Sequence, residues 1–153
     1  MKNAFYNSIG METFGLRMER VCDNAKTLAQ FFATEYSDIE VNYPGLAGSK
    51  WHNIATEQFG DKFGGIITIR TGNKKRAFGI IDALKLPLIV SNIGDTKTLV
   101  IHPESTLNVH STQEEKETAG VFDDLIRISV GIEDIDDLID DFKQAIESVK
   151  DVY

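Results

Sequence analysis

The sequence predicts an α+β domain in which helices cover one face of a mostly antiparallel sheet of about four to five strands. Short β-branched runs bounded by turn residues alternate with segments whose apolar residues recur every three or four positions. One such run, residues 125–130, leads directly into an acidic and strongly amphipathic segment. The length of 153 residues, with 42% hydrophobic and 26% charged residues, is typical of a single globular domain.

The first half of the chain predicts a long helix, a strand, a short helix and a second strand. Residues 39–43 alternate as a strand that ends at a Pro-Gly pair, residues 51–59 have the pattern of a short helix, and residues 65–71 are β-branched. The apolar face of the long helix consists of Phe14, Met18, Val21, Cys22, Ala25, Leu28, Ala29 and Phe32.

In the second half, Asn73 is a candidate N-cap for a helix whose inward face carries Ala77, Ile80, Ile81 and Leu84. Residues 88–91 and 99–102 are expected to form strands on either side of a turn at Asn92. Residues 103–120 are polar and loop-like, with a short acidic helix near residues 113–118. A last helix is expected to face inward through Ile135, Leu138, Ile139, Phe142, Ile146 and Val149.

The composition excludes several classes of function. A net charge of −8 and a pI near 4.8 argue against nucleic-acid binding and against anionic membranes. The sequence has neither an apolar run of membrane-spanning length nor a signal-peptide pattern, so we expect a cytoplasmic protein. The only cysteine, Cys22, lies among apolar helix positions and is expected to be a buried, unreactive thiol.

No metal site or catalytic group is predicted within this chain. The three histidines are far apart, and His102 is expected to be structural. Neither a Gly-x-Ser-x-Gly elbow nor a phosphate-binding loop is present. An acidic run lacks the glycine and the alternating oxygens of a calcium loop, so we expect a solvated helix face formed by Asp134, Asp136, Asp137, Asp140 and Asp141.

Arg127 is the strongest candidate for a binding residue. In a strand, Ile126, Ile128 and Val130 share one face, whereas Arg127 and Ser129 share the other. A guanidinium held on a strand can bind a carboxylate through two parallel hydrogen bonds. The alternative is a solvent-facing arginine on a half-exposed sheet. An arginine reserved for substrate is expected to have no structural partner.

Several motifs together resemble the Cys/Met-metabolism family of pyridoxal-phosphate enzymes. The match covers residues 3–149, nearly the whole chain. Two of the motifs, Asn-Ile-Gly-Asp at 92–95 and Ile-His-Pro at 101–103, are similar to the O-acetylhomoserine sulfhydrylase branch. The others are Gly10 to Arg20, Tyr43-Pro44-Gly45-Leu46, Phe63-Gly64-Gly65 and Leu125 to Asp134.

This resemblance implies the C-terminal domain of a fold-type I pyridoxal-phosphate enzyme. Residues 1–36 would be an interdomain-type helix and residues 37–153 the substrate-binding domain, with the N-terminal cofactor domain absent. The family's cofactor lysine lies in a Ser-x-Thr-Lys motif, which this sequence lacks, and Thr96-Lys97 is its only Thr-Lys pair. We therefore expect that the chain holds no cofactor and is inactive alone, although the intact family enzyme uses pyridoxal phosphate.

The resemblance also implies that Arg127 and Asn92 bind the α-carboxylate of an activated homoserine, as in enzymes of methionine and cysteine biosynthesis. After the proline of Ile-His-Pro, family members usually carry a small residue and then Ser-x-Thr-His. Here Glu104 takes the first position, and Leu107 and Asn108 replace the Thr-His pair, which leaves the exact substrate open.

Three interpretations remain from the sequence. The first is a C-terminal domain fragment of an O-acetylhomoserine sulfhydrylase-like enzyme. The second is a free-standing amino-acid-binding or regulatory module, and the third is the small half of a split enzyme whose partner is a separate cofactor-domain chain. We also expect self-association through apolar residues that would lose a partner surface, namely Phe5, Tyr6, Ile9 and Met11.

Overall fold

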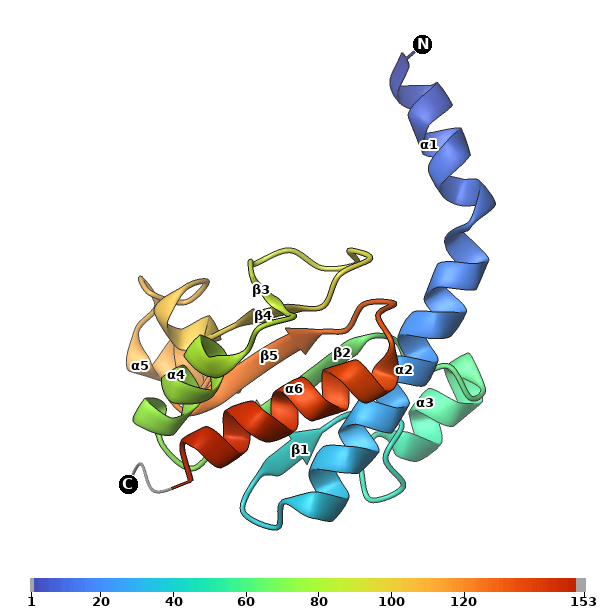
Figure 1. Ribbon diagram of the computed structural model, residues 1–153. Helices are drawn as coiled ribbons and strands as arrows, with labels where there is room; N and C mark the ends of the chain where they lie inside the picture. Colours follow the sequence, from blue (N-terminus) through green and yellow to red (C-terminus); the bar gives the residue numbers. More distant parts are fainter. Residues whose placement is uncertain (1, 151–153) are drawn as a thin grey trace.

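A computed structural model describes residues 2–150 and places a five-stranded sheet at the centre of the protein (Figure 1). The strand order is β1-β2-β5-β4-β3, so the strand that carries Arg127 is the middle one. β5 pairs antiparallel with both of its neighbours, and only β3 and β4 run parallel. The mostly antiparallel sheet predicted from the sequence is therefore confirmed. The strands are β1 (Glu40–Asn42), β2 (Ile66–Arg70), β3 (Leu88–Ile89), β4 (Leu99–Ile101) and β5 (Leu125–Ser129).

Three helices pack together on one face of the sheet, as the sequence predicts (Figure 1). They are α2 (Phe14–Glu35), α4 (Lys74–Ala83) and α6 (Ile135–Ser148). The other helical segments are α1 (Lys2–Glu12), α3 (His52–Phe59), η1 (Pro103–Ser105) and α5 (Gln113–Thr118).

The core lies between these three helices and the alternate strand residues that face them. Phe32 of α2 and Phe142 of α6 are both fully buried and meet edge to face, with ring centroids 5.2 Å apart. Ile126 and Ile128 of β5 are also fully buried in this cluster. Each fully buried side chain of this size contributes about 1.5–3 kcal/mol, so the core fixes which face of β5 is turned inward.

Local capping explains where three of the helices begin. The Asn73 side chain accepts a hydrogen bond from the Arg76 backbone N–H at 2.8 Å, which confirms the predicted N-cap of α4. Thr112 and Glu115 form a reciprocal capping box at the start of α5. Asp134 caps α6 by accepting from the Asp136 N–H.

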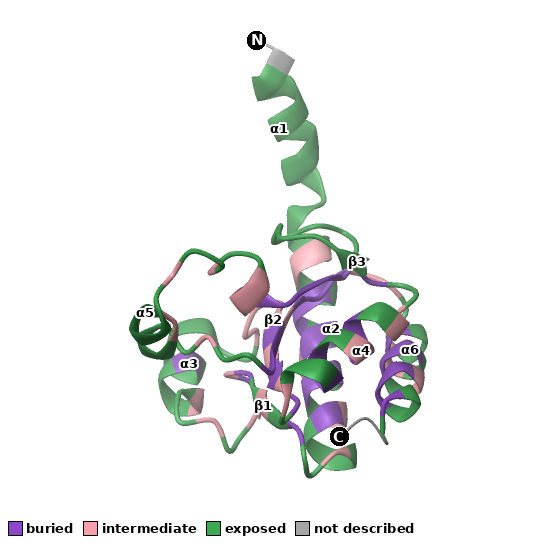
Figure 2. Ribbon diagram, turned by 90° about the vertical axis from the view of Figure 1, so that its left-hand side faces the viewer, coloured by how far each residue is buried: buried purple, intermediate pink, exposed green. Residues whose placement is uncertain are grey.

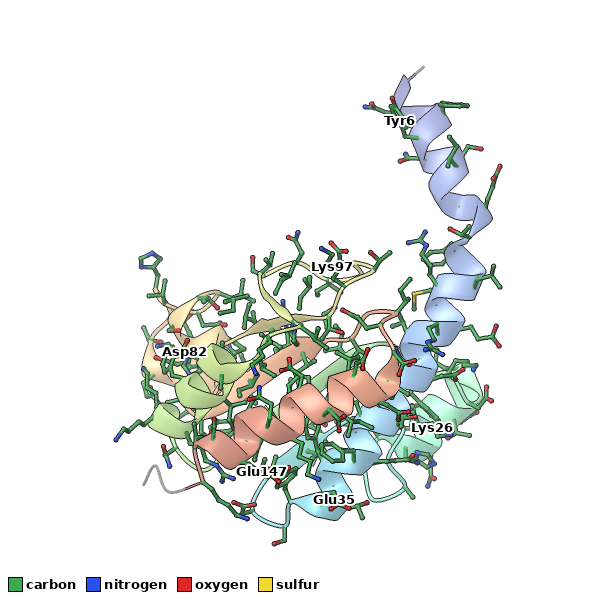
Figure 3. All side chains as sticks on the ribbon, viewed as in Figure 1. Tyr6, Lys26, Glu35, Asp82, Lys97 and Glu147 are labelled. Atoms are coloured by element: carbon green, nitrogen blue, oxygen red, sulfur yellow. The ribbon has the colours of Figure 1, made fainter. Side chains whose placement is uncertain are left out.

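The first helix projects away from the rest of the molecule (Figure 2). Its large apolar side chains are exposed, including Phe5 at 63%, Tyr6 at 68% and Met11 at 66%. Figure 3 shows Tyr6 on the outer part of this helix, away from the sheet. α1 is therefore an apolar surface without a partner among the described residues.

Two details differ from the sequence-based expectations. The segment expected to be a turn at Asn92 is a longer connection, residues 90–98, because it joins the parallel strands β3 and β4. Asp141 is not on a solvated face. It is 6% exposed, and its carboxylate accepts hydrogen bonds from the backbone N–H groups of Lys85 and Leu86. The remaining residues of the acidic run, Asp134, Asp136, Asp137 and Asp140, are exposed as expected.

None of the helices within residues 2–150 is both long and apolar enough to cross a membrane.

Candidate functional site

Arg127 lies at the centre of the sheet, on the face opposite the helical layer. The register places Thr68 of β2 and Ile101 of β4 on either side of it. Ile126 and Ile128 are fully buried against the helices, so the alternation of β5 turns Arg127 the other way. The strand therefore presents a guanidinium on a rigid element, which is the arrangement that the sequence predicts.

The guanidinium is partly buried but has no acidic partner. Its Nη2 donates to the backbone carbonyls of Ser91 at 2.9 Å and Asn92 at 3.3 Å. Its Nε is buried and has no hydrogen-bond partner among the described residues, and no carboxylate there forms an ion pair with it. Burial lowers the pKa of Arg127 below its ordinary value. A partly desolvated cation bonded only to neutral carbonyls is suited to accept an anionic ligand.

These two contacts correct one expectation. Arg127 does have structural partners, because the carbonyls of the 90–98 loop hold one side of its guanidinium. The reason is geometric: the loop that joins parallel strands crosses over the end of the neighbouring strand instead of turning back beside it.

Asn92 is brought next to Arg127, but through its backbone. Its carbonyl accepts from Nη2, and the residue is exposed. Nearby, the Gly94 N–H donates to Ser129 Oγ at 3.3 Å, and Gly94 has a φ of 80°, a conformation that glycine adopts without strain. The loop is thus held over the Arg127 face at several points.

A small cavity of about 180 Å³ lies beside this loop. Ser129 and residues 93–96 form one part of its lining. The rest includes Arg17 and apolar residues such as Phe14, Met18 and Ile66. It is a pocket of the right size for a short aliphatic group near the face that carries Arg127.

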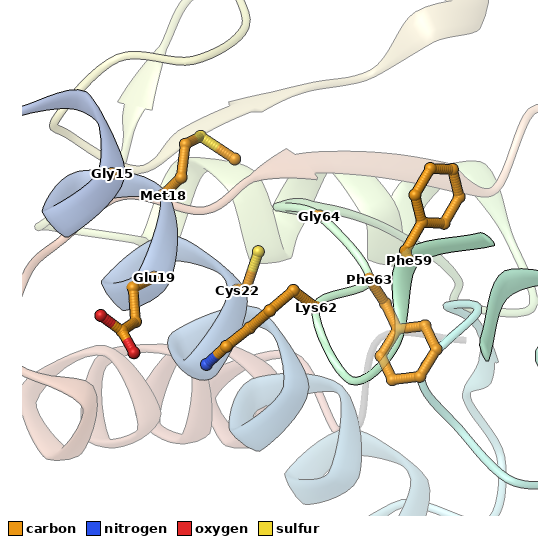
Figure 4. A pocket seen from close by; sticks show the side chains of 8 residues that line it. All are labelled: Gly15, Met18, Glu19, Cys22, Phe59, Lys62, Phe63 and Gly64. Atoms are coloured by element: carbon orange, nitrogen blue, oxygen red, sulfur yellow. The ribbon is translucent and has the colours of Figure 1, made fainter. Parts of the chain in front are cut away.

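A larger apolar cavity of about 610 Å³ lies between α2 and α3 (Figure 4). Met18, Cys22 and Phe63 contribute to its lining, and Cys22 is buried, as predicted. The one lysine that lines it, Lys62, forms an ion pair with Asp23 at 2.6 Å. Apart from Lys62, the only charged residue that lines this cavity is Glu19, and Arg127 does not line it.

The stretch that follows Ile101-His102-Pro103 is held by polar contacts. His102 is 3% exposed, with Nε2 2.7 Å from the Asp123 carbonyl and Nδ1 2.9 Å from Ser105 Oγ, which supports its structural interpretation. Leu107 is 54% exposed, and Asn108 is bonded through its backbone N–H to the Pro103 carbonyl. Neither of these two residues contacts Arg127 through a hydrogen bond in the described structure.

Sequence reasoning missed two charged groups of this region. Glu133 belongs to the strand-to-helix motif but was assigned no role, although its carboxylate binds Thr98 at the base of the 90–98 loop. Glu104 was noted only as a departure from the family pattern, and it joins Lys74 and Lys116. An acidic residue in a motif that also contains turns and small residues can indicate such a contact. The partners of Glu133 and Glu104 could not be predicted, because they lie far away in the sequence.

The sequence and the fold match a known class of enzyme. Residues 1–147 match the family described as Cys/Met metabolism PLP-dependent enzyme, and the chain belongs to this family.

Relatives of known activity support the same assignment. An L-methionine gamma-lyase from Fusobacterium nucleatum subsp. polymorphum is 39% identical over 149 residues, covering 97% of this chain and 38% of the lyase. O-acetyl-L-homoserine sulfhydrylase 1 from Thermus thermophilus is 39% identical over 139 residues, covering 90% of this chain and 33% of that enzyme. The structure of an O-acetylhomoserine sulfhydrylase from Wolinella succinogenes aligns with a TM-score of 0.82 at 35% identity, covering 95% and 38% of the two chains. The chain therefore spans between 33% and 38% of the length of these relatives.

The described residues do not by themselves fit a pyridoxal phosphate site. The cofactor needs a lysine amine facing a cavity and a cluster of donors for its phosphate. The lysines that line cavities here are engaged elsewhere: Lys62 with Asp23, Lys116 with Glu104, and Lys50 over the Trp51 ring at 5.0 Å. Lys97 of the only Thr-Lys pair lies on the exposed 90–98 loop (Figure 3).

Proposed function

We propose that this chain provides the substrate-carboxylate site of an O-acetylhomoserine sulfhydrylase-like enzyme, and that Arg127 holds the α-carboxylate of an amino-acid substrate. The observation that carries this proposal is the state of the guanidinium, which is partly buried, lacks an acidic partner and has two nitrogens without a protein acceptor among the described residues. A structural arginine in such a position would normally be paired with an acid.

The geometry assigns each group a task. The Ser91 and Asn92 carbonyls hold Nη2, so the guanidinium plane is fixed before a ligand arrives. A carboxylate bound at the remaining nitrogens would be oriented by Arg127, and the exposed Asn92 amide could donate one further hydrogen bond. Pyridoxal phosphate, where a complete family enzyme holds it, supplies the electron sink for the chemistry at the substrate α-carbon. This chain contributes binding and orientation.

The match to relatives also supports activated homoserine as the substrate class. The names of the Thermus thermophilus and Wolinella succinogenes proteins refer to O-acetylhomoserine sulfhydrylases. The small cavity beside Ser129 and the 93–96 segment could accommodate a short aliphatic portion of a ligand held at Arg127. Because Leu107 and Asn108 replace the Thr-His pair of the family pattern, experiment has to distinguish between related substrates.

The experiment joins this chain to the cofactor-binding part of a relative and measures turnover of O-acetylhomoserine. Arg127→Lys keeps the charge but removes the planar fork, and losing one charge-assisted bond in a desolvated site costs about 2–4 kcal/mol. We expect kcat/KM to fall about 30- to 1,000-fold. The matched control is Arg70→Lys, because Arg70 is already paired with Asp124 at 2.9 Å. This substitution should lower stability without changing kcat/KM.

Activity within about threefold of the parent in Arg127→Lys would contradict the carboxylate assignment and favour a purely structural arginine.

The exposed apolar surface of α1 supports a split enzyme as a second candidate, since such a surface usually marks an interaction site. Simple mixing with a separate cofactor-domain chain distinguishes the two: recovery of activity without a covalent link favours the split enzyme.

A further inference from the structure

The 90–98 loop, whose carbonyls hold Arg127, is anchored at its base by Thr98. Thr98 is completely buried, and its backbone carbonyl accepts from the Leu88 N–H at 2.9 Å, which closes the loop at its other end. Its N–H donates to Glu133 Oε1 at 2.5 Å, and its hydroxyl donates to Glu133 Oε2 at 2.9 Å. One carboxylate therefore binds both donors of one buried threonine.

The residues that follow β5 form backbone hydrogen bonds with the same loop. The Gly131 N–H donates to Thr98 Oγ1 at 2.9 Å, and the Ile132 N–H donates to the Thr96 carbonyl at 2.9 Å. A Cβ atom at Gly131 would fall 2.5 Å from both the Thr96 oxygen and the Lys97 carbonyl carbon. The absence of a side chain at this position is what lets the loop lie directly on the strand that leads from Arg127.

Hydrogen bonds from α2 hold the segment that carries Glu133. Asn24 of α2 is 2% exposed, and its Nδ2 donates to the Gly131 carbonyl at 3.1 Å and to the Glu133 carbonyl at 2.9 Å. The backbone on either side of Ile132 is thus fixed to the core. Glu133 is therefore a link between a rigid element and the loop.

We propose that Glu133 is a positioning residue, which fixes the 90–98 loop so that the Ser91 and Asn92 carbonyls orient the Arg127 guanidinium. The inference rests on the proposed function, because orientation matters only where Arg127 receives a carboxylate. An ionised carboxylate suits the geometry, since both of its oxygens accept from Thr98. Glu133→Gln keeps the size of the side chain but removes its charge, so the hydrogen bonds to Thr98 lose their charge assistance.

The test uses the whole 153-residue chain labelled with ¹⁵N. Two quantities are measured: hydrogen exchange of the Thr98 amide and the side-chain signals of Arg127, whose Nη2 protons are resolved when carbonyls restrict rotation of the guanidinium. We expect Glu133→Gln to speed Thr98 exchange by about tenfold or more and to average the Arg127 signals. Thr98→Val should also average them, whereas Thr98→Ser, which keeps the hydroxyl, should restore the parent spectrum. Asp140→Asn, an exposed acid on α6, is the charge-matched control and should change neither quantity.

The proposal is overturned if the Thr98 amide becomes exposed while the Arg127 signals stay as in the parent, because Glu133 then supports only the loop base. It is also overturned if Thr98 exchange does not change, or if both Glu133→Gln and Thr98→Val unfold the chain. None of these results depends on a bound ligand. Failure of the carboxylate assignment in Arg127→Lys can therefore be distinguished from failure of the role proposed for Glu133.

Discussion

Glu104 offers a sharp test of how this chain holds the region after its Ile-His-Pro motif. Glu104 forms ion pairs with Lys116 of α5 at 2.6 Å and Lys74 of α4 at 2.8 Å. Hydrogen bonds from these two lysines lower the pKa of Glu104 from 4.5 to about 2. Glu104→Gln keeps the size of the side chain and removes the charge that joins two helices.

The expected loss follows from this pKa. A fall from 4.5 to about 2 corresponds to at most about 3.4 kcal/mol of stability, at about 1.36 kcal/mol per pH unit. The Lys116 side chain is only 12% exposed, but that of Lys74 is 47% exposed, so solvent weakens the second pair. We therefore expect Glu104→Gln to lower the free energy of unfolding by about 1–2 kcal/mol at neutral pH.

The pH dependence has a definite sign. The carboxyl is more acidic in the folded chain, so its stabilisation is complete above the unfolded pKa of about 4.5 and is lost as the pH falls towards about 2. Urea unfolding of parent and Glu104→Gln should differ fully at about pH 7, and by less than half of that at about pH 3. Glu57→Gln, an exposed acid on α3, is the matched control. A difference below about 0.3 kcal/mol at neutral pH, or one that does not change with pH, would refute the role of this cluster.

Three further outcomes are expected. Phe142→Ala should lower the free energy of unfolding by about 3–5 kcal/mol in urea titrations, because Phe142 is fully buried against Phe32, and a loss below about 1 kcal/mol would contradict this core. Asp141→Ala should cost about 1–3 kcal/mol by the same measurement, since it leaves the Lys85 and Leu86 amides without their acceptor; an unchanged midpoint would argue against the contact. Light scattering should show self-association that rises with concentration and weakens in a variant with serine at Phe5 and Ile9, whereas a monomer at all concentrations would argue against an exposed apolar α1.

The sequence predicted the fold well where a pattern and its physical cause are local. The alternation of residues 125–130 and the three- and four-residue spacing of α6 each follow from burial on one side, and both elements occur as predicted. The N-cap at Asn73 is equally local. The prediction that Asp141 lies on a solvated face was wrong for the opposite reason. Its acceptor role depends on the Lys85 and Leu86 amides, which lie 56 and 55 residues away, so the sequence near position 141 does not indicate it.

In the candidate site, too, the local features could be predicted and the long-range contacts could not. The face on which Arg127 lies follows from strand periodicity, so it could be predicted from the alternation of residues 125–130 alone. Its contacts could not, because they depend on the parallel pairing of β3 with β4, which carries the 90–98 loop across the sheet. Two strands either side of a turn signal are usually read as neighbours that reverse direction. The Glu133 contact was hidden for the same reason, since Thr98 lies 35 residues earlier in the chain.

The uncovered helix and the arginine without an acid can be explained together. α1 projects from the same side of the molecule as the 90–98 loop, as both views of the ribbon show (Figures 1 and 2). A partner that covers Phe5, Tyr6 and Met11 would therefore lie near the loop and reduce the access of water to Arg127. The attraction between a guanidinium and a carboxylate rises steeply as water is removed, so a site left open would hold its ligand weakly. We therefore expect the proposed carboxylate site to bind its ligand more tightly when the surface of α1 is covered.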